Sequence, residues 1–428
     1  MNTWYLLCFL SALAILIAFA NQYLLKLQTT IAITTGSVLL SLVLMFSYSL
    51  MGEDIAAPIS QALQSLDLNQ LLLKGMLGFL LFAGAMEIDL HELKKQRWEI
   101  TVLVIFSTLT STLLVGYLSF WLLGAIGWPV PFIYCLLFGA LISPTDPIAV
   151  LAIIKQMNAP EGISIQVEGE SLFNDGVGLV VFTTIFAVAF NGGEATFSGV
   201  AELFISDALG GILFGFALAV SGHYLMLLSK DDVNIRLLIT LIIPSAGFAL
   251  ANLMEVSGAL AMVVSGIFIG NVTRAKVANQ DDPRSANYIS NFWHATDSFL
   301  NSLLFLLIGL ALVMLPITFA EMAVSLLFIP VVLLSRFISV GLPFSVFRRF
   351  RQYDVNSVKI LTWGGLRGGL ALAMAASIPT QVASVNNVDI HNLILLITYV
   401  IVIFSIVVQG LTIAPMIRTS IKAANTTR

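Results

Sequence analysis

Two apolar segments decide how this chain folds: GALISPTDPIAV at residues 139–150 and, after a short linker, EGESLFNDG at residues 168–176. Together they carry Asp146, Glu170 and Asp175 in surroundings that otherwise suit lipid. A carboxylate at the centre of a bilayer costs about 2.5–3.5 kcal/mol on insertion scales. We therefore expect these three carboxylates to carry a function.

Two prolines interrupt the first segment. Pro144 and Pro147 bracket Asp146, and each proline removes a backbone N–H and clashes with the preceding helical turn. The helix is therefore predicted to break at Asp146. Carbonyls freed beside a carboxylate suit a desolvated cation, and broken helices are tolerated at membrane depth where they line a cavity.

The composition is that of an integral membrane protein. Hydrophobic residues make up 58% of the 428 residues and charged residues only 10%, whereas a soluble domain carries about 25% charged residues. The two cysteines, Cys8 and Cys135, lie in apolar stretches without metal-type spacing, so neither a disulfide nor a zinc site is expected. Neither a cofactor nor a nucleic-acid partner is expected, and the protein is expected to contact membrane lipid.

The hydropathy pattern predicts an all-α polytopic fold, because a span needs about 20 apolar residues. About thirteen spans are predicted, at residues 4–25, 29–49, 70–90, 98–123, 129–153, 164–190, 205–228, 236–255, 257–273, 291–316, 322–344, 358–379 and 391–416. Residues 50–69 are too polar to span and are expected to form an interfacial helix.

The positions of the charges orient these spans. If the N-terminus is outside, one set of connections and the tail hold seventeen of the twenty Lys and Arg residues: Lys26, Lys94, Lys95, Arg97, Lys155, Lys230, Arg236, Arg274, Lys276, Arg284, Arg348, Arg349, Arg351, Lys359, Arg418, Lys422 and Arg428. The other set holds Lys74 beside Glu53, Asp54, Asp67, Glu194, Glu202, Asp207, Glu255, Glu321 and Asp389. Basic residues mark the cytoplasmic side, so the N-terminus is predicted outside and the C-terminus in the cytoplasm.

A second broken span is predicted near the C-terminus. Arg367 lies in WGGLRGGLALAMAASIP, where four glycines crowd the middle of the span at 358–379. Interruptions at matching places in two halves of a transporter indicate inverted repeats with a site at the midplane. The two breaks are the middle spans of the triplets 4–6 and 11–13, which have opposite orientations in the membrane, as an inverted repeat requires.

The charged groups around the first break are the candidate ion site. A hard cation such as Na⁺ prefers oxygen ligands, and Asp146, Asp175, Thr145 and Ser171 offer them. These residues are predicted to bind and transport the cation, with Asp146 and Asp175 as its principal ligands.

Helical spacing adds two further polar groups. Glu170 with Asn174, and Ser171 with Asp175, are i, i+4 pairs, so four polar side chains share one stripe of the sixth span. This stripe is expected to face the break in the fifth span. A purely structural polar network is the alternative, but the density of polar groups disfavours it.

Competition between the cation and protons for Asp175 would couple the cation flux to the proton flux. Burial disfavours the charged form of a carboxyl group, so Asp175 is expected to hold either a cation or protons, not both. If only loaded states reorient, cations and protons are exchanged.

The buried cations and other carboxylates are predicted to be charge partners. Arg367 is expected to pair with Glu170 and hold the broken span; direct repulsion or mimicry of the transported cation is the alternative. Glu87 and Arg336 are also expected to be charge partners. Asp297, Asn301 and Ser302 are assigned no single role, since capping, packing and lining of the ion route all fit.

These motifs resemble the monovalent cation:proton antiporter family, in its prokaryotic sodium/proton exchanger branch. The matching stretches are Thr145-Asp146-Pro147, Glu170-Ser171 with Asn174-Asp175, and Gly364-Gly365-Leu366-Arg367-Gly368. The resemblance implies thirteen helices in a homodimer. Spans 4–6 and 11–13 would form the moving, ion-translocating core, from residues 98–190 and 317–428, and residues 1–97 and 191–316 would form the dimer scaffold. The resemblance also implies that Glu170 and Asn174 support the site and control proton access. It further implies electroneutral one-for-one exchange, because Asn174 rather than a second aspartate precedes Asp175.

Three other functions are alternatives to Na⁺/H⁺ exchange. An exchanger that prefers K⁺, or takes Li⁺ as well, fits the same residues. A cation channel would need a repeated filter or a charge ring, and the sequence has one asymmetric site. An intramembrane enzyme would need a paired nucleophile and base, and no such pattern is present, so the chain is predicted not to be an enzyme.

Overall fold

The computed structural model describes residues 3–51, 56–64, 66–67, 69–157, 161–190, 197–229, 232–279, 283–315, 317–347, 357–380 and 389–426. Across these residues the protein is helical, and the single pairing of extended backbone is an antiparallel bridge between Asp146 and Leu366. The predicted all-α class is confirmed.

The helices follow one another along the chain with short connections. The first half contains α1 (Thr3–Leu24), α2 (Thr29–Met51), α3 (Ala56–Gln64), η1 (Gln70–Met76), α4 (Leu77–Glu87), α5 (Leu90–Lys95), α6 (Arg97–Val102), η2 (Leu103–Ser107), α7 (Thr108–Ile126), α8 (Phe132–Ile142), α9 (Ile148–Gln156) and α10 (Glu161–Phe190). The second half contains α11 (Phe197–Leu228), α12 (Val233–Ile242), η3 (Ile243–Gly247), α13 (Phe248–Leu253), α14 (Gly258–Phe268), η4 (Ile269–Thr273), α15 (Arg274–Asn279), α16 (Pro283–Leu310), η5 (Ala311–Met314), α17 (Phe319–Phe347), α18 (Ser357–Trp363), α19 (Gly369–Ala376), α20 (Ile390–Ile403), η6 (Phe404–Gln409) and α21 (Gly410–Thr426).

Eleven helical stretches among the described residues are long and apolar enough to cross a membrane. They are Trp4–Leu24, Thr29–Phe46, Gln70–Glu87, Arg97–Ile126, Gly162–Phe190, Gly199–Leu228, Val233–Leu253, Gly258–Ala278, Ser285–Met314, Phe319–Val346 and Ile390–Arg418. They correspond to eleven of the expected spans. The residues of the other two, 129–153 and 358–379, form pairs of shorter helices: α8 with α9, and α18 with α19.

Short polar residues set several helix starts. The side chains of Asp89, Asp232 and Asp389 accept hydrogen bonds from the first-turn N–H groups of α5, α12 and α20, and Ser257 does the same for α14. Such caps satisfy donors that have no partner within the helix. Gly127, with φ +89°, ends α7 in a conformation that favours glycine.

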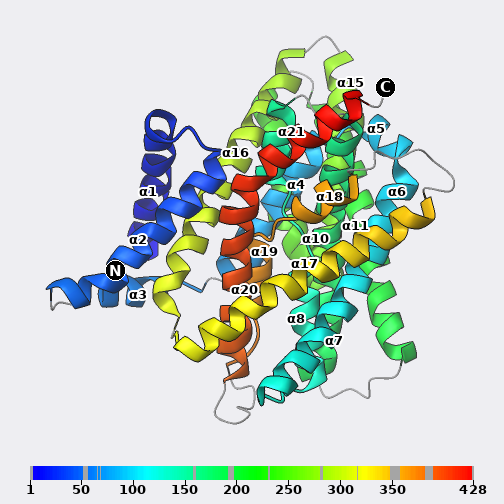
Figure 1. Ribbon diagram of the computed structural model, residues 1–428. Coiled ribbons are helices and arrows are strands. Elements are labelled where there is room, and N and C mark those ends of the chain that lie inside the picture. The colour runs from blue at the N-terminus through cyan, green and yellow to red at the C-terminus, as the bar shows by residue number, and fades with distance from the viewer. Residues whose placement is uncertain are drawn as a thin grey trace.

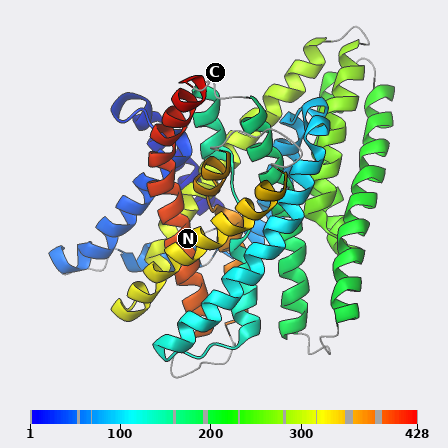
Figure 2. The ribbon, with the colours of Figure 1, turned by 45° about the vertical axis from the view of Figure 1, so that its right-hand side comes forward.

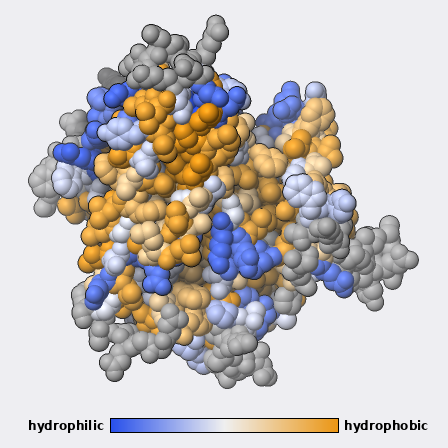
Figure 3. Space-filling model, turned by 180° about the vertical axis from the view of Figure 1, so that it is seen from behind, coloured by the Kyte–Doolittle hydropathy of each residue, from blue (hydrophilic) through white to orange (hydrophobic). Residues whose placement is uncertain are grey.

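The short helices α18 and α19 lie between the outer helices of the molecule (Figure 1). Figures 1 and 2 show α1 and α2 on one flank and α11 on the opposite flank, with α18, α19 and α10 between them. Apolar residues cover most of the face in Figure 3. Exposed Phe9, Leu213 and Phe216 on the two flanks suit contact with lipid.

Close helix packing fixes α8 against α7. A Cβ on Gly139 would lie 2.3 Å from the carbonyl oxygen of Thr112, so only glycine allows this approach. The hydroxyls of Thr112 and Ser143 are 3.2 Å apart. The end of α8, where the chain leaves the helix, is therefore held by α7.

Some sequence predictions fall on residues outside the described ranges. Among the charges that orient the chain these are Glu53, Asp54, Glu194, Lys230, Arg348, Arg349, Arg351 and Arg428. Of the expected interfacial segment 50–69, the described part includes the short helix α3.

Candidate functional site

The interruptions of the two short-helix pairs meet. α8 ends at Ile142 and α9 begins at Ile148, while α18 ends at Trp363 and α19 begins at Gly369. Between them, the Asp146 N–H donates to the Leu366 carbonyl at 2.8 Å. The two extended stretches thus satisfy each other's backbone where no helix does.

Arg367 stabilises this crossing through backbone carbonyls. Its Nη1 donates to the carbonyl oxygens of Ser143 at 2.6 Å and Pro144 at 2.8 Å. These carbonyls lie just beyond the last turn of α8, where helical partners run out. The Arg367 N–H in turn donates to the Ser405 hydroxyl of η6 at 3.0 Å. Arg367 therefore joins one interruption to the other.

The predicted pairing of Arg367 with Glu170 is wrong. Arg336 of α17 makes that ion pair, with Nη1 2.6 Å from Glu170 Oε1 and both side chains almost fully buried. Arg336 also donates to the Ser107 hydroxyl and the Leu361 carbonyl. The reason is geometric, since the guanidinium of Arg367 is already directed at the end of α8.

A hydrogen-bond network connects α10 to the first interruption. The Asn174 amide accepts from the Thr145 N–H at 3.2 Å and donates to the Thr145 hydroxyl at 2.9 Å. The Ser171 hydroxyl donates to the Thr145 carbonyl and lies 3.3 Å from the Thr145 hydroxyl. Asn174 and Ser171, which share one face of α10, therefore both bind Thr145, as the sequence pattern predicts.

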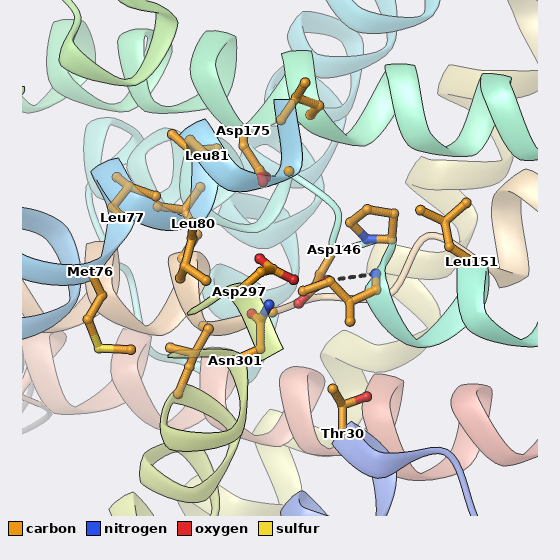
Figure 4. Close-up of a pocket in the computed structure, with 18 of the residues that line it drawn as sticks. Thr30, Met76, Leu77, Leu80, Leu81, Asp146, Leu151, Asp175, Asp297 and Asn301 are labelled. Atoms are coloured by element: carbon orange, nitrogen blue, oxygen red, sulfur yellow. Dashed lines mark hydrogen bonds between the residues drawn. The ribbon is translucent and has the colours of Figure 1, made fainter. Parts of the chain in front are cut away.

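Asp146 and Asp175 face one cavity of about 450 Å³. Figure 4 shows Asp175 reaching it from α10 and Asp146 from the interruption, with Asp297 and Asn301 beside them. Asp146 Oδ1 accepts from the Ile148 N–H at 3.0 Å. The cavity thus brings together two carboxylates that are separated by a full helix in sequence.

The cavity has a charged end and an apolar end. At one end lie Glu87, Lys155, Glu168 and His294, and Glu87 Oε1 is 2.9 Å from the His294 ring nitrogen. Away from these residues the lining is apolar, with Leu72, Leu73 and Met76 of η1 and Leu304 of α16. Over the whole lining, five carboxylates face the two basic groups Lys155 and His294, and this excess suits a cation.

Sequence reasoning underrated Asp297 and Asn301 of α16, which both line the cavity. The available signal was their i, i+4 spacing, with Ser298 and Ser302 forming a parallel pair. What it lacked was the position of α16 beside Asp146, which depends on contacts between distant parts of the chain.

Among the described residues, no group of three or more His, Cys, Asp or Glu side chains is arranged to hold a metal ion. The polar groups of the cavity are instead spread along its length.

Comparison with known proteins gives one consistent result. A family model described as "Sodium/hydrogen exchanger, transmembrane" matches residues 12–419. The chain is 39% identical over 411 residues to the Na(+)/H(+) antiporter NhaP of Pseudomonas aeruginosa, covering 95% of this chain and 94% of the relative. It is 30% identical over 347 residues to NhaH of Halobacillus dabanensis, covering 80% and 81%.

The fold is also similar to a solved structure. The sodium proton antiporter MjNhaP1 from Methanocaldococcus jannaschii matches with a TM-score of 0.70 over 97% of this chain and 99% of that chain, at 18% identity. From the family match over most of its length, together with these relatives, the chain belongs to the sodium/hydrogen exchanger family.

Proposed function

We propose that this protein exchanges Na⁺ for H⁺ across the cytoplasmic membrane by alternating access. The observation that carries the proposal is the approach of Asp146 and Asp175 to one cavity, where two helix interruptions cross. The relatives named as Na(+)/H(+) antiporters support it. The relatives are named as antiporters, and the proposed exchange includes no chemical reaction on a substrate.

The transported Na⁺ is held mainly by Asp146 and Asp175, and Thr145 and Ser171 supply further oxygens. The two hydrogen bonds between Asn174 and Thr145 support this role, because they fix the peptide next to Asp146. Hard cations prefer such oxygen ligands. No bound cofactor takes part.

Glu170 and Arg336 stabilise the helices around the site without binding the ion. Their buried ion pair ties α10 to α17, and Glu170 lies on the same helix as Asn174 and Asp175. A buried pair of this kind fixes the register of the helices rather than binding the cargo.

Coupling arises because Asp175 binds either the cation or protons. If only the loaded states reorient, each Na⁺ that moves one way requires protons to move the other way. Because Asn174 is neutral, the pair Asn174-Asp175 supplies one ionisable group, and exchange is one-for-one and electroneutral.

The helix arrangement supports a thirteen-span topology with inverted repeats. In it, α8 with α9 and α18 with α19 each cross the membrane as one broken span, and the N-terminus is outside. Residues 98–190 and 317–428 then form the moving core, and residues 1–97 and 191–316 form the scaffold of a homodimer. In this orientation the charged end of the cavity, with Glu87 and His294, faces the cytoplasm.

Transport in proteoliposomes tests the proposal. A sodium pulse should dissipate an imposed pH gradient in wild-type vesicles, and Asp175→Asn should abolish this response. Asp207→Asn is the matched control, because Asp207 lies on α11 and contacts Thr183 outside the cavity. Sodium-driven proton flux that survives in Asp175→Asn would refute the proposed role.

The same vesicles test cation preference. Equal pulses of NaCl, LiCl and KCl should give the strongest response to Na⁺. A stronger response to K⁺ would establish the K⁺-preferring alternative, and cation flux with no proton flux would establish a channel.

A further inference from the structure

We propose that Asp297 and Asn301 of α16 form an outer cation position between the charged end of the cavity and the pair Asp146–Asp175. This inference rests on the proposed function and adds a second place where the incoming ion pauses. It makes Asp297 a residue that sets apparent affinity for Na⁺.

The first support is the order of polar groups along α16. His294, Asp297 and Asn301 follow one another at helical spacing and all line the cavity, and Leu304 follows them. At about 1.5 Å of rise per residue, they form a ladder on one helix face. The ladder leads from the charged end toward the interior, so a cation that enters meets Asp297 before Asn301.

The second support is the condition of the Asn301 amide. Asn301 is 3% exposed, and apart from a side-chain contact with Asp297 its amide has no hydrogen-bond partner within the part of the chain that the structure describes. Figure 4 shows the side chain in the cavity next to Asp297. A buried amide normally has partners. A partly hydrated cation supplies these partners, because the amide oxygen binds the ion and the amide nitrogen donates to a water molecule of the ion's hydration shell.

The third support is electrostatic. Asp297 lies close enough to Glu87, Asp146 and His294 for their charges to act on it. It therefore continues the negative field from the mouth to the ion site. Charge placed along an entry route raises the local concentration of cations and the rate of association.

The outer position is distinct from the inner one. No group of three acidic side chains in the described ranges is close enough to hold one metal ion together, so Asp297 does not join Asp146 and Asp175 around a single Na⁺. The ion is handed from one position to the next. The alternative is that Asp297 and Asn301 only help to pack α16, and the experiment must distinguish this role from cation binding.

The experiment measures sodium-dependent proton flux in proteoliposomes across a range of Na⁺ concentrations. Asp297→Asn should raise the KM for Na⁺ by about ten-fold and leave kcat within about two-fold, as expected where a charge acts on association. Asp297→Glu should restore most of the affinity. Asn301→Leu should raise KM in the same direction, and Asp207→Asn should change neither constant.

Ionic strength gives a second readout that packing would not move. Added choline chloride should shrink the difference in KM between wild type and Asp297→Asn, because salt screens a charge on an entry route. An unchanged KM in Asp297→Asn, or a fall in kcat alone, would overturn the outer position. Loss of flux in the wild type would instead refute the exchange function itself, so the two failures are distinguishable.

Discussion

At the scale of single residues, Asn174 and Thr145 show how the site is held together. The amide of Asn174 both accepts from and donates to Thr145, at the N–H and at the hydroxyl. The peptide that precedes Asp146 is therefore fixed by a side chain of another helix. The hydrogen bonds contribute only modest energy, but they fix the backbone from which the Asp146 side chain extends.

Thr145→Val should weaken sodium binding without unfolding the protein. Valine keeps the shape of threonine but removes the hydroxyl that accepts from Asn174, which leaves a buried amide donor unpaired at about 1–3 kcal/mol. We expect a higher KM for Na⁺ in the vesicle assay, and Thr145→Ser should retain near-normal affinity. An unaltered KM in Thr145→Val would remove this hydroxyl from the ion site.

The pair Arg336–Glu170 should prove strongly coupled. Breaking one partner of a buried ion pair destabilises a protein by about 3–5 kcal/mol. Arg336→Met and Glu170→Met alone should each lower the Tm in detergent, and the double variant should lose less than the sum of the two. Additive losses would show that the pair contributes nothing beyond its separate contacts.

At the scale of helices, the crossing of the two interruptions depends on glycine. A Cβ on Gly368 would lie 2.4 Å from Asp146 Oδ2, so the chain at this point leaves room only for hydrogen. The backbone of the second interruption at Gly368 therefore packs directly against the Asp146 carboxylate and limits its position.

Gly368→Ala should abolish transport by displacing the Asp146 carboxylate. Gly124→Ala is the matched control, since nothing lies within 4 Å of a Cβ there, and alanine should stabilise α7 by up to about 1 kcal/mol. Flux measurements on both variants test this. Normal flux in Gly368→Ala would mean that the carboxylate is free to move away from Gly368.

Helix contacts also show what the sequence could predict. The Thr145 network follows from the polar stripe on one helix that includes Ser171 and Asn174, and from the prolines beside Asp146, which are local features. The partner of Glu170 did not follow, because Arg336 and Arg367 are both buried cations, and only the packing of both α17 and α10 against η2 distinguishes them. Asp297 was underrated for the same reason, since its cavity exists only after α16 packs beside α4.

At the scale of the whole molecule, the cavity has one charged end, and the predicted topology places that end in the cytoplasm. Ser298 lines the cavity and is exposed. Thr318 lies on the opposite side in that topology, before α17. The two positions therefore offer a test of orientation.

A cysteine at Ser298 should react with a membrane-impermeant thiol reagent only from the cytoplasmic side, in a background with Cys8 and Cys135 replaced by serine. A cysteine at Thr318 should react only from the outside. Labelling inside-out and right-side-out vesicles checks both positions. The reverse pattern would invert the proposed topology.

Proton release on sodium binding tests the shared carboxylate most directly. Purified protein in weakly buffered detergent should release protons when NaCl is added, because Na⁺ displaces them from Asp175. Asp175→Asn should release none, while Asp207→Asn should match the wild type. Sodium binding without proton release in the wild type, or unchanged release in Asp175→Asn, would contradict competition at this residue.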